Sequence, residues 1–164
     1  MARKKKKKKR SSHPAIPERP QLKARADKLW SLAVKNDWNH TCAVCGKRDA
    51  LNSHHMVPRM FFNTRFDLLN GICLCYRCHT KCAKYSPHQN SAGFDDWLKD
   101  NHLHLWHWVH DNKHPPPVTT SENFYLDMVM YLREYVEPTD FDRILGVKFA
   151  GYIRELEAQL DAAE

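Results

Sequence analysis

Two pairs of cysteines with the spacing C-x-x-C constrain this chain more than any other feature. They are Cys42 with Cys45 and Cys75 with Cys78. Two such pairs can supply four thiolates to one tetrahedral zinc ion, at Zn–S distances near roughly 2.3 Å. Buried free cysteines or a redox-active pair are the alternatives. We expect a structural Zn²⁺ held in a knuckle, with Gly46 after the first pair supplying the turn.

The segment between the two pairs is longer than a simple zinc ribbon requires. It holds 29 residues, 46–74, against an interval of roughly 15–20 in zinc ribbons. Short apolar runs alternate with Cys, His, Gly and Asn from Trp38 to Tyr85, which predicts a knuckle, a β-hairpin with a long loop, a second knuckle and a short helix. Cys73 and Cys82 could exchange into the zinc site, but neither preserves two spaced pairs, so we expect core or free thiols there.

Histidines in this insert and after it suggest a second metal site. His54 and His55 are adjacent, and successive residues of a strand point to opposite faces. At a strand end, one of them can bind a metal while the other turns toward a substrate water. His79 follows the last cysteine and opens the short helix, so it can share the metal held by His54.

Taken together, these residues resemble the HNH endonuclease family. The string C-x-x-C-G … H-H-x-x-P-R … N-G-I-x-L-C-x-x-C-H carries the resemblance, which covers about residues 38–97. The stretch TRFDLLNGICLCYRCHT is similar to phage recombination endonucleases of the NinG-like kind. The resemblance implies a ββα-metal fold and hydrolysis of DNA phosphodiester bonds by a one-metal mechanism, with branched or recombination DNA as a plausible substrate.

The resemblance also implies a role for each matching residue. His54 would be the first ligand of the catalytic metal, His55 the general base, Asn70 the residue that orients the loop and the base, and His79 the second ligand. Many relatives carry Asp where this chain has His54. An all-imidazole set is softer than one with a carboxylate and favours Mn²⁺, Ni²⁺, Co²⁺ or Zn²⁺ over Mg²⁺.

Basic residues are the expected contacts to DNA. Arg59 and Arg65 flank the proposed site, and a guanidinium suits phosphate oxygens; ordinary exposed arginines are the alternative. Residues 1–10 hold eight of the 26 Lys and Arg residues, while the remaining 18 are balanced by 19 acidic residues. Such a run should be disordered and bind phosphates without regard to sequence, or else act as a solubilising or nuclear-localisation-like tail. The lysines concerned are Lys4, Lys5, Lys6, Lys7, Lys8 and Lys9.

Apolar residues at helical spacing predict helices on both sides of this core. We expect helices over 21–37, 94–112, 121–136 and 141–160. The run HPPPV at 114–118 breaks the second, Thr120 and Ser121 cap the third, Pro138 stops it, and Asp140 caps the last. The fold class expected is α+β: a ββα-metal (HNH) core with a four-cysteine zinc knuckle, an N-terminal helix and a helical C-terminal extension.

The predicted organisation has three parts. Residues 1–20 form a disordered basic tail and linker, 21–112 an HNH nuclease domain with flanking helices, and 113–164 the helical extension, which either closes a core over the nuclease unit or forms a homodimer surface. No segment reaches the roughly 18 apolar residues that span a bilayer, and no apolar region follows the basic N-terminus as in a secretory signal. We therefore expect a cytoplasmic protein, in the host cell if phage-encoded, that binds DNA and no membrane.

Three functions compete at this point. The leading one is a metal-dependent DNA endonuclease. A non-catalytic zinc-knuckle DNA-binding protein would keep the four cysteines and the basic tail but would not need His55 or Asn70, whose presence favours the enzyme. A zinc-stabilised protein-interaction module would bind no DNA, and its complex would lack the steep salt dependence of phosphate contacts.

Overall fold

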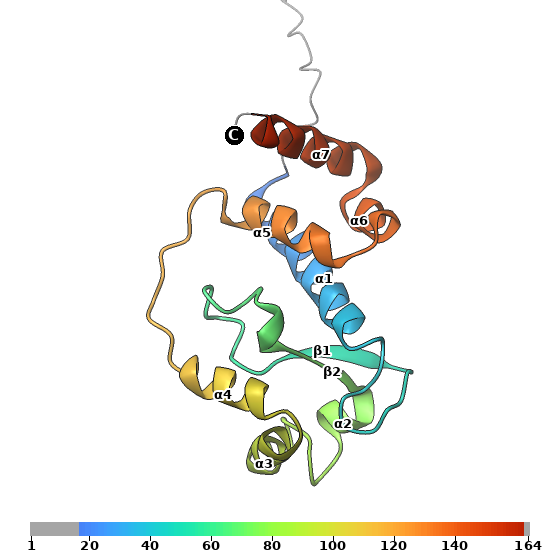
Figure 1. Cartoon of the computed structure of the whole chain (residues 1–164), viewed down its shortest axis with the longest axis vertical. Coiled ribbons are helices and arrows are strands. Elements are labelled where there is room, and N and C mark those ends of the chain that lie inside the picture. The colour runs from blue at the N-terminus through green and yellow to red at the C-terminus, as the bar shows by residue number, and fades with distance from the viewer. Residues whose placement is uncertain (1–16, 163–164) are drawn as a thin grey trace, which may run out of the picture.

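The computed structural model describes residues 17–162. It is a mixed structure of helices and one small two-stranded sheet, consistent with the α+β class (Figure 1). The elements are α1 (Arg19–Asp37), β1 (Leu51–His55), β2 (Gly71–Cys75), α2 (Tyr76–Thr80), α3 (Ser91–Asn101), α4 (Leu103–Asp111), α5 (Phe124–Leu132), α6 (Pro138–Leu145) and α7 (Val147–Asp161). Single 3₁₀ turns precede β2, at Leu68–Asn70, and follow α5, at Arg133–Tyr135.

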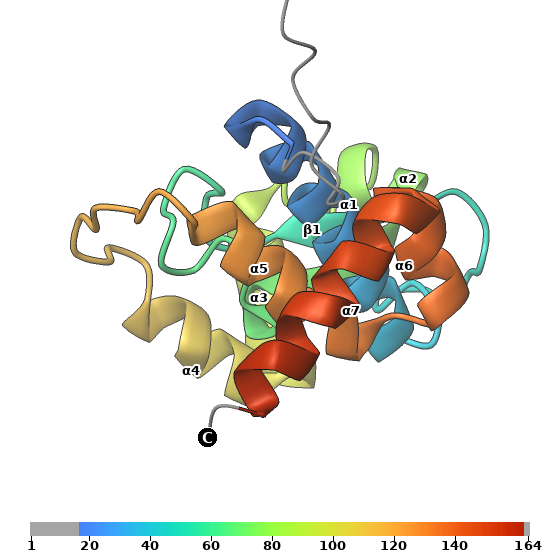
Figure 2. The ribbon, with the colours of Figure 1, turned by 90° about the horizontal axis from the view of Figure 1, so that it is seen from above.

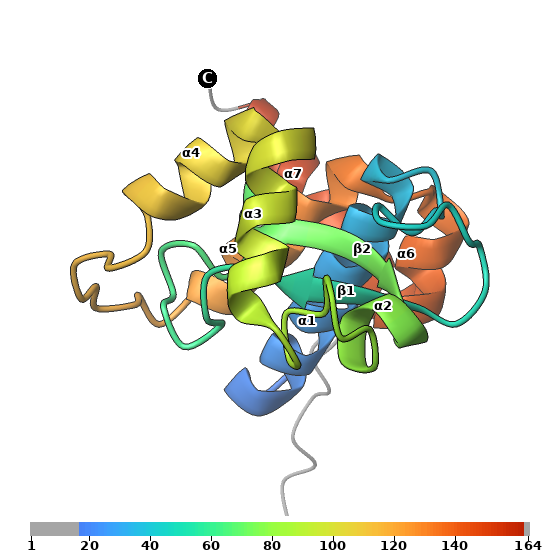
Figure 3. The ribbon, with the colours of Figure 1, turned by 90° about the horizontal axis from the view of Figure 1, so that it is seen from below.

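The sheet is an antiparallel hairpin whose two faces are both covered. β1 pairs with β2 from Leu51 opposite Cys75 to His55 opposite Gly71. Every residue of β2 is buried, because α1 lies against one face of the hairpin and α3 crosses the other (Figure 3). A hairpin alone is marginally stable in water, so these two helices and the knuckle supply most of its stability.

Two hydrophobic cores hold the chain together. The first joins α1 to α5, α6 and α7, which lie together at one end of the molecule in Figure 1 and in front of the hairpin in the view from above (Figure 2). The second surrounds Ile72 and Leu74 of β2 and includes cysteines of the knuckle and apolar residues of α3 and α4. Helix α1 therefore packs on the C-terminal helices and on the hairpin alike, and the division at residues 112 and 113 stays a prediction.

Several predicted helix boundaries are wrong. The first helix begins at Arg19, inside the predicted linker, because a proline is favourable in the first helical turn. The second is interrupted at His102, between α3 and α4, and the third begins after Asn123 rather than after Thr120 or Ser121.

The last helix departs furthest from the prediction. Pro138 does not merely stop the preceding helix; it opens α6, with Glu137 rather than Asp140 at the N-cap. Gly146 then separates α6 from α7 with a φ of +82°, a conformation that costs glycine little and other residues more. Asp140 instead pairs with Arg143 one turn later. Among the described residues, no helix is long and apolar enough to cross a membrane.

Candidate functional site

The two cysteine pairs come together into one cluster. The sulfur atoms of Cys42, Cys45, Cys75 and Cys78 all lie within 4.8 Å of one another, and the Sγ atoms of Cys45 and Cys75 are 3.6 Å apart. Sulfurs bound to one tetrahedral zinc are about 3.8 Å apart, given the usual Zn–S distance. The cluster is therefore consistent with structural zinc. Burial, followed by the neighbouring Cys45 and Cys75, raises the pKa of the Cys78 thiol, and a cation among the sulfurs would reverse that effect.

The local backbone explains how the pairs meet. The first pair lies in a turn that closes with Gly46 N–H donating to Cys42 O, and Gly46 has a φ of +71°. The second pair spans the end of β2 and the short helix α2. A bond from Ala43 N–H to Cys73 O ties the turn to β2, so the sheet fixes the distance between the pairs.

A second cluster consists of three histidines. His54 Nδ1 lies 3.1 Å from His79 Nε2, and His88 Nε2 lies 3.1 Å from the same atom. Nitrogen ligands at about 2.1 Å from one ion are separated by about 3.0–3.4 Å, so the three rings fit a single divalent metal. Burial, and then the neighbouring imidazoles, lowers the pKa of His54 to about 3; burial and His88 lower the pKa of His79. Both are therefore neutral near pH 7, as metal binding requires.

His88 was not among the residues predicted from the sequence. It lies on the loop between α2 and α3, and Ser86 holds this loop: its hydroxyl donates to His79 O at 2.7 Å and accepts from the backbone N–H of His88 at 3.2 Å. Ser86 is fully buried, although the loop around it is polar. The available signal was one more histidine nine residues after His79. Two histidines alone leave a metal under-coordinated, so a third protein ligand near them is chemically reasonable.

His55 points to the opposite face of the strand from His54, as strand alternation predicts. Its ring stacks on Trp30 of α1, with 3.6 Å between centroids and 14° between planes. Its Nε2 lies 2.9 Å from the carbonyl oxygen of Arg65. Because a carbonyl only accepts, Nε2 carries the proton and Nδ1 is left unprotonated in the neutral ring. Burial lowers the pKa of His55 to about 4 despite that hydrogen bond, so the ring is neutral at neutral pH.

Asn70 is fully buried and anchors the loop that follows His55. Its Oδ1 accepts from Val57 N–H at 2.6 Å, and its Nδ2 donates to Val57 O at 3.0 Å and Thr64 O at 2.9 Å. The amide therefore joins both ends of the loop, using its donor and acceptor together. The hydrogen bond of the His55 ring goes to Arg65 O, so Asn70 contacts the backbone around the histidine rather than its ring.

The two arginines predicted to contact phosphate have different surroundings. Arg65 is 4% exposed; its Nε and Nη2 donate to the Asp27 carboxylate of α1 at 2.6–3.0 Å, and its Nη1 donates to Arg59 O. Its donors are thus occupied within the protein, and a phosphate would have to displace Asp27. The side chain of Arg59 is exposed.

The remaining residues singled out in the sequence are the lysines of the N-terminal run and the two cysteines outside the knuckle. Lys4, Lys5, Lys6, Lys7, Lys8 and Lys9 lie outside the described residues. Cys73 is fully buried in β2, where burial raises the pKa of its thiol to about 11, and Cys82 is half-buried outside the cluster.

Comparison with known proteins bears on the segment that holds these clusters. Residues 42–84 match the model of the HNH endonuclease family, a segment that runs from the first cysteine of the knuckle to just past α2. No curated protein and no solved structure matches the chain. The match supports the HNH family and indicates a nuclease or nucleic-acid-binding function with DNA as partner, while a particular closeness to recombination endonucleases is not supported.

Proposed function

We propose that this chain is a metal-dependent DNA endonuclease of the HNH family, with His55 as general base. One observation carries the proposal: the imidazoles of His54, His79 and His88 converge at metal-ligand distances, one residue away from a histidine whose tautomer is set by a backbone carbonyl. A zinc knuckle that only binds DNA has no need for this second cluster. The cluster is therefore the feature that separates an enzyme from a binding module.

The three histidines would hold a divalent ion of intermediate softness. Three imidazoles without a carboxylate favour Mn²⁺, Ni²⁺, Co²⁺ or Zn²⁺ over Mg²⁺. A bound ion would polarise the scissile phosphate and stabilise charge on the leaving 3′ oxygen. The chain's own contribution is to bring the three rings together, with His54 packed edge-on against His79, His88 and Phe94.

His55 is built to take a proton from a water molecule. Its Nε2–H is committed to Arg65 O, so Nδ1 is the only ring nitrogen that can accept. The Trp30 ring prevents rotation of the imidazole, and burial keeps it unprotonated before the reaction. The protonated ring formed in the step is stabilised by the same carbonyl, because a charged imidazolium strengthens its hydrogen bond to Arg65 O.

Phosphate contact and substrate preference are further parts of the proposal. Arg59 is the better candidate for a direct phosphate contact because its side chain is exposed, whereas Arg65 acts through its carbonyl and its ion pair with Asp27. Lys4 to Lys9 would add affinity that declines with salt. Branched or recombination DNA and a phage origin rest on the resemblance of the sequence, whereas action in the cytoplasm rests on the expected lack of a membrane span and of a secretory signal.

The proposal is tested by DNA cleavage at matched zinc content. Supercoiled plasmid and a branched oligonucleotide are incubated in Mn²⁺ with the wild-type protein, His55→Ala and His54→Ala. We expect the wild type to cut, and each variant to bind DNA with similar affinity but to cut at least 100-fold more slowly, the lower end of the range for loss of a general base. His104→Ala, an exposed histidine outside both clusters, is the control that should cut normally.

Two results would refute the proposal that the chain is a nuclease. If all variants cut as the wild type does, neither cluster residue is catalytic. If no protein cuts any substrate in Mn²⁺, Ni²⁺, Co²⁺, Zn²⁺ or Mg²⁺, yet all bind DNA with a steep salt dependence, the chain is a zinc-knuckle DNA-binding protein. The interaction-module alternative would instead show no DNA binding.

A further inference from the structure

A large cleft opens beside the histidine cluster. It has a volume of about 780 Å³, within the roughly 300–1,000 Å³ typical of ligand pockets. His54 and His55 are among its lining residues. One wall is the loop after β1, with Met60 and Phe61, and the other consists of α3 and the end of α4, with Phe94 and Val109. The cleft is thus continuous with the proposed catalytic site.

Two apolar residues of this wall have no role in either hydrophobic core. Met60 is 72% exposed, the most exposed large apolar side chain among the described residues. Phe61 also lines the cleft and belongs to neither core cluster, whereas the next residue, Phe62, packs against the first core. Met60 is exposed and Phe61 is half-buried, so packing into a hydrophobic core accounts for neither side chain. Exposed apolar side chains grouped beside a site mark a binding surface.

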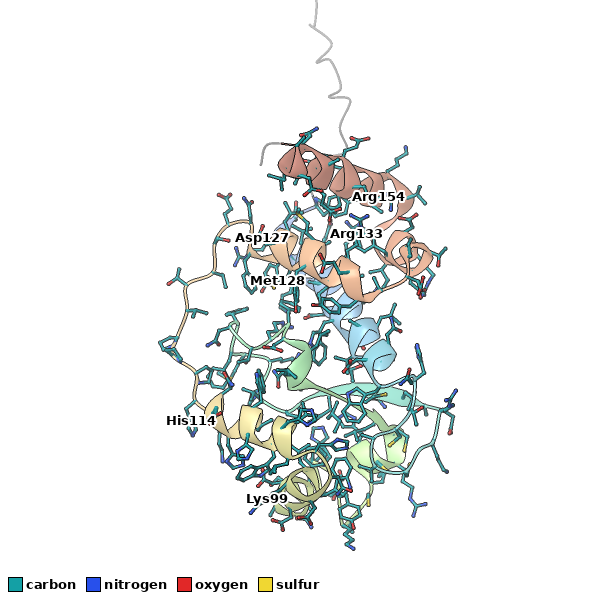
Figure 4. All side chains as sticks on the ribbon, in the orientation of Figure 1. Lys99, His114, Asp127, Met128, Arg133 and Arg154 are labelled. Atoms are coloured by element: carbon teal, nitrogen blue, oxygen red, sulfur yellow. The ribbon has the colours of Figure 1, made fainter. Side chains whose placement is uncertain are left out.

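The charges around the cleft favour a nucleic acid strand over a neutral ligand. Lys113 and His114 lie on its rim, just after α4; Figure 4 labels His114 there. The acidic lining residue, Asp95, already has partners: its carboxylate accepts from Trp106 Nε1 at 3.1 Å and lies 3.0 Å from His110 Nε2. A phosphate entering the cleft meets the Lys113 ammonium beside the apolar wall.

We propose that this cleft binds an unpaired nucleobase of the strand being cut, next to the scissile phosphate. The proposal rests on the proposed nuclease function and names its substrate class. In a continuous duplex the bases are stacked and paired, so phosphates and groove edges would face the apolar wall, which offers them no hydrogen bonds. An unpaired base presents an apolar face that stacks on an aromatic ring and inserts between apolar side chains. Flaps, bulges and branch points offer such a base without the free-energy cost of extruding it.

The inference is tested by binding rather than cutting. Three duplexes of one sequence are compared: one with a single unpaired 2-aminopurine, one with an abasic site at that position, and one fully paired. Dissociation constants and 2-aminopurine fluorescence are measured with the full-length, zinc-loaded protein and no added divalent metal. We expect about tenfold tighter binding of the unpaired base than of the abasic site, with quenched fluorescence, within the range for one base–aromatic contact.

Variants locate the base. Phe61→Ala should remove the preference for the base over the abasic site, and Met60→Ala should reduce it. Because Met60 is 72% exposed, we expect its truncation to leave the fold intact. Tyr131→Ala, which removes an exposed aromatic residue of α5 outside the cleft, is the matched control and should keep the preference.

The outcomes separate this inference from the nuclease proposal. Equal binding of base and abasic site by the wild type, or an unchanged preference in both Phe61→Ala and Met60→Ala, overturns the subsite. A preference that disappears in Phe61→Ala supports the subsite even if no metal supports cleavage, in which case the nuclease proposal fails alone. Cleavage of the paired and unpaired substrates at equal rates, with equal binding, would leave the nuclease proposal standing and remove the subsite.

Discussion

The ion pair between Asp27 and Arg65 connects α1 to the proposed base, and its removal tests that connection. The Asp27 carboxylate accepts three hydrogen bonds from the Arg65 guanidinium, at 2.6, 2.8 and 3.0 Å. The carbonyl of the same arginine accepts from His55 Nε2 at 2.9 Å. Replacing Asp27 by Asn keeps the shape of the side chain and removes its charge, so the arginine loses its carboxylate partner without a cavity being created.

The loss of stability follows from the exposure of the two partners. Breaking a fully buried pair costs about 3–5 kcal/mol, and exposed pairs contribute about 0–1 kcal/mol. The Arg65 side chain is 4% exposed and that of Asp27 is 33% exposed, so water can replace only part of the interaction. We expect Asp27→Asn to lower the free energy of unfolding by about 2 kcal/mol, equivalent to a fall in Tm of about 4–8 °C for a chain of this size.

The effect on cleavage should exceed what the loss of stability explains. An arginine that moves away from its pair shifts its own carbonyl, and with it the ring of His55. Misplacing a catalytic group by about 1 Å can reduce a rate on the order of 100-fold. We expect the single-turnover cleavage rate, measured well below Tm where the variant is folded, to fall about 10- to 100-fold. The DNA concentration at half-maximal rate should stay near the wild-type value, because neither residue of the pair is expected to contact DNA.

Asp140→Asn supplies the matched control. It breaks the Asp140–Arg143 pair on α6, in which Arg143 is 71% exposed, and should change stability by less than about 0.5 kcal/mol and leave cleavage unaffected. The reasoning is refuted if Asp27→Asn lowers Tm as expected but cuts at the wild-type rate, because the ion pair would then have no part in placing His55. A Tm equal to that of the wild type would refute the estimate of the buried pair itself.

Three further predictions concern the metals and the packing of the hairpin. His88→Ala should weaken Mn²⁺ binding at least tenfold by calorimetry while one zinc per chain remains, since it removes one of three imidazoles but no cysteine; unchanged affinity would exclude His88 as a ligand. Cys45→Ser should lower the zinc content measured by mass spectrometry and lower Tm, because three thiolates bind zinc less tightly than four; full zinc occupancy would mean that the cluster is not the zinc site. Gly71→Ala should lower the free energy of unfolding in urea by about 1–3 kcal/mol, because its Cβ would collide with Val34 Cγ2 of α1. Gly151→Ala in α7, where a Cβ meets nothing within 4 Å, should raise it by about 0.5–1 kcal/mol. The reverse order of stabilities would contradict the packing of α1 on β2.

The parts of the site predicted from the sequence are those encoded by short spacing. The C-x-x-C pairs identify four sulfurs that do meet, because a two-residue spacing fits one metal whatever the rest of the fold does. The opposite orientation of His54 and His55 also follows from strand geometry alone. The hairpin with its long loop and the short helix after it could be predicted because turn residues and apolar runs alternate there.

Contacts between segments that are distant in the sequence could not be predicted from short spacing. The stacking of Trp30 on His55 joins residues 25 positions apart, and the pair of Asp27 with Arg65 joins residues 38 positions apart. Nothing in the amphipathic pattern of α1 distinguishes Trp30 from an ordinary core residue. Arg65 was predicted to face phosphate because a guanidinium beside the proposed site suits phosphate oxygens, and only its burial reveals the internal partner.

The predicted helix boundaries are wrong for a different reason. Apolar periodicity continues through Gly146, so the pattern of 141–160 predicts one helix, yet a single positive φ turns the chain and lets α6 and α7 both pack into the core around α1. Packing against a third element outweighs the small free-energy difference between one helix and two.

The position of α1 determines what the HNH segment can do by itself. Residues 42–84 hold the cysteines, two of the three clustered histidines and His55, but neither the ring that stacks on His55 nor the carboxylate that holds Arg65. Both come from α1, whose other side is buried against α5 and the helices after it. The orientation of the proposed base therefore depends, through α1, on the packing of the C-terminal helices, although none of them contributes a residue to either metal cluster. Destabilising that packing should impair cleavage before it releases zinc, because the knuckle is held by its own sulfurs while His55 is held by α1.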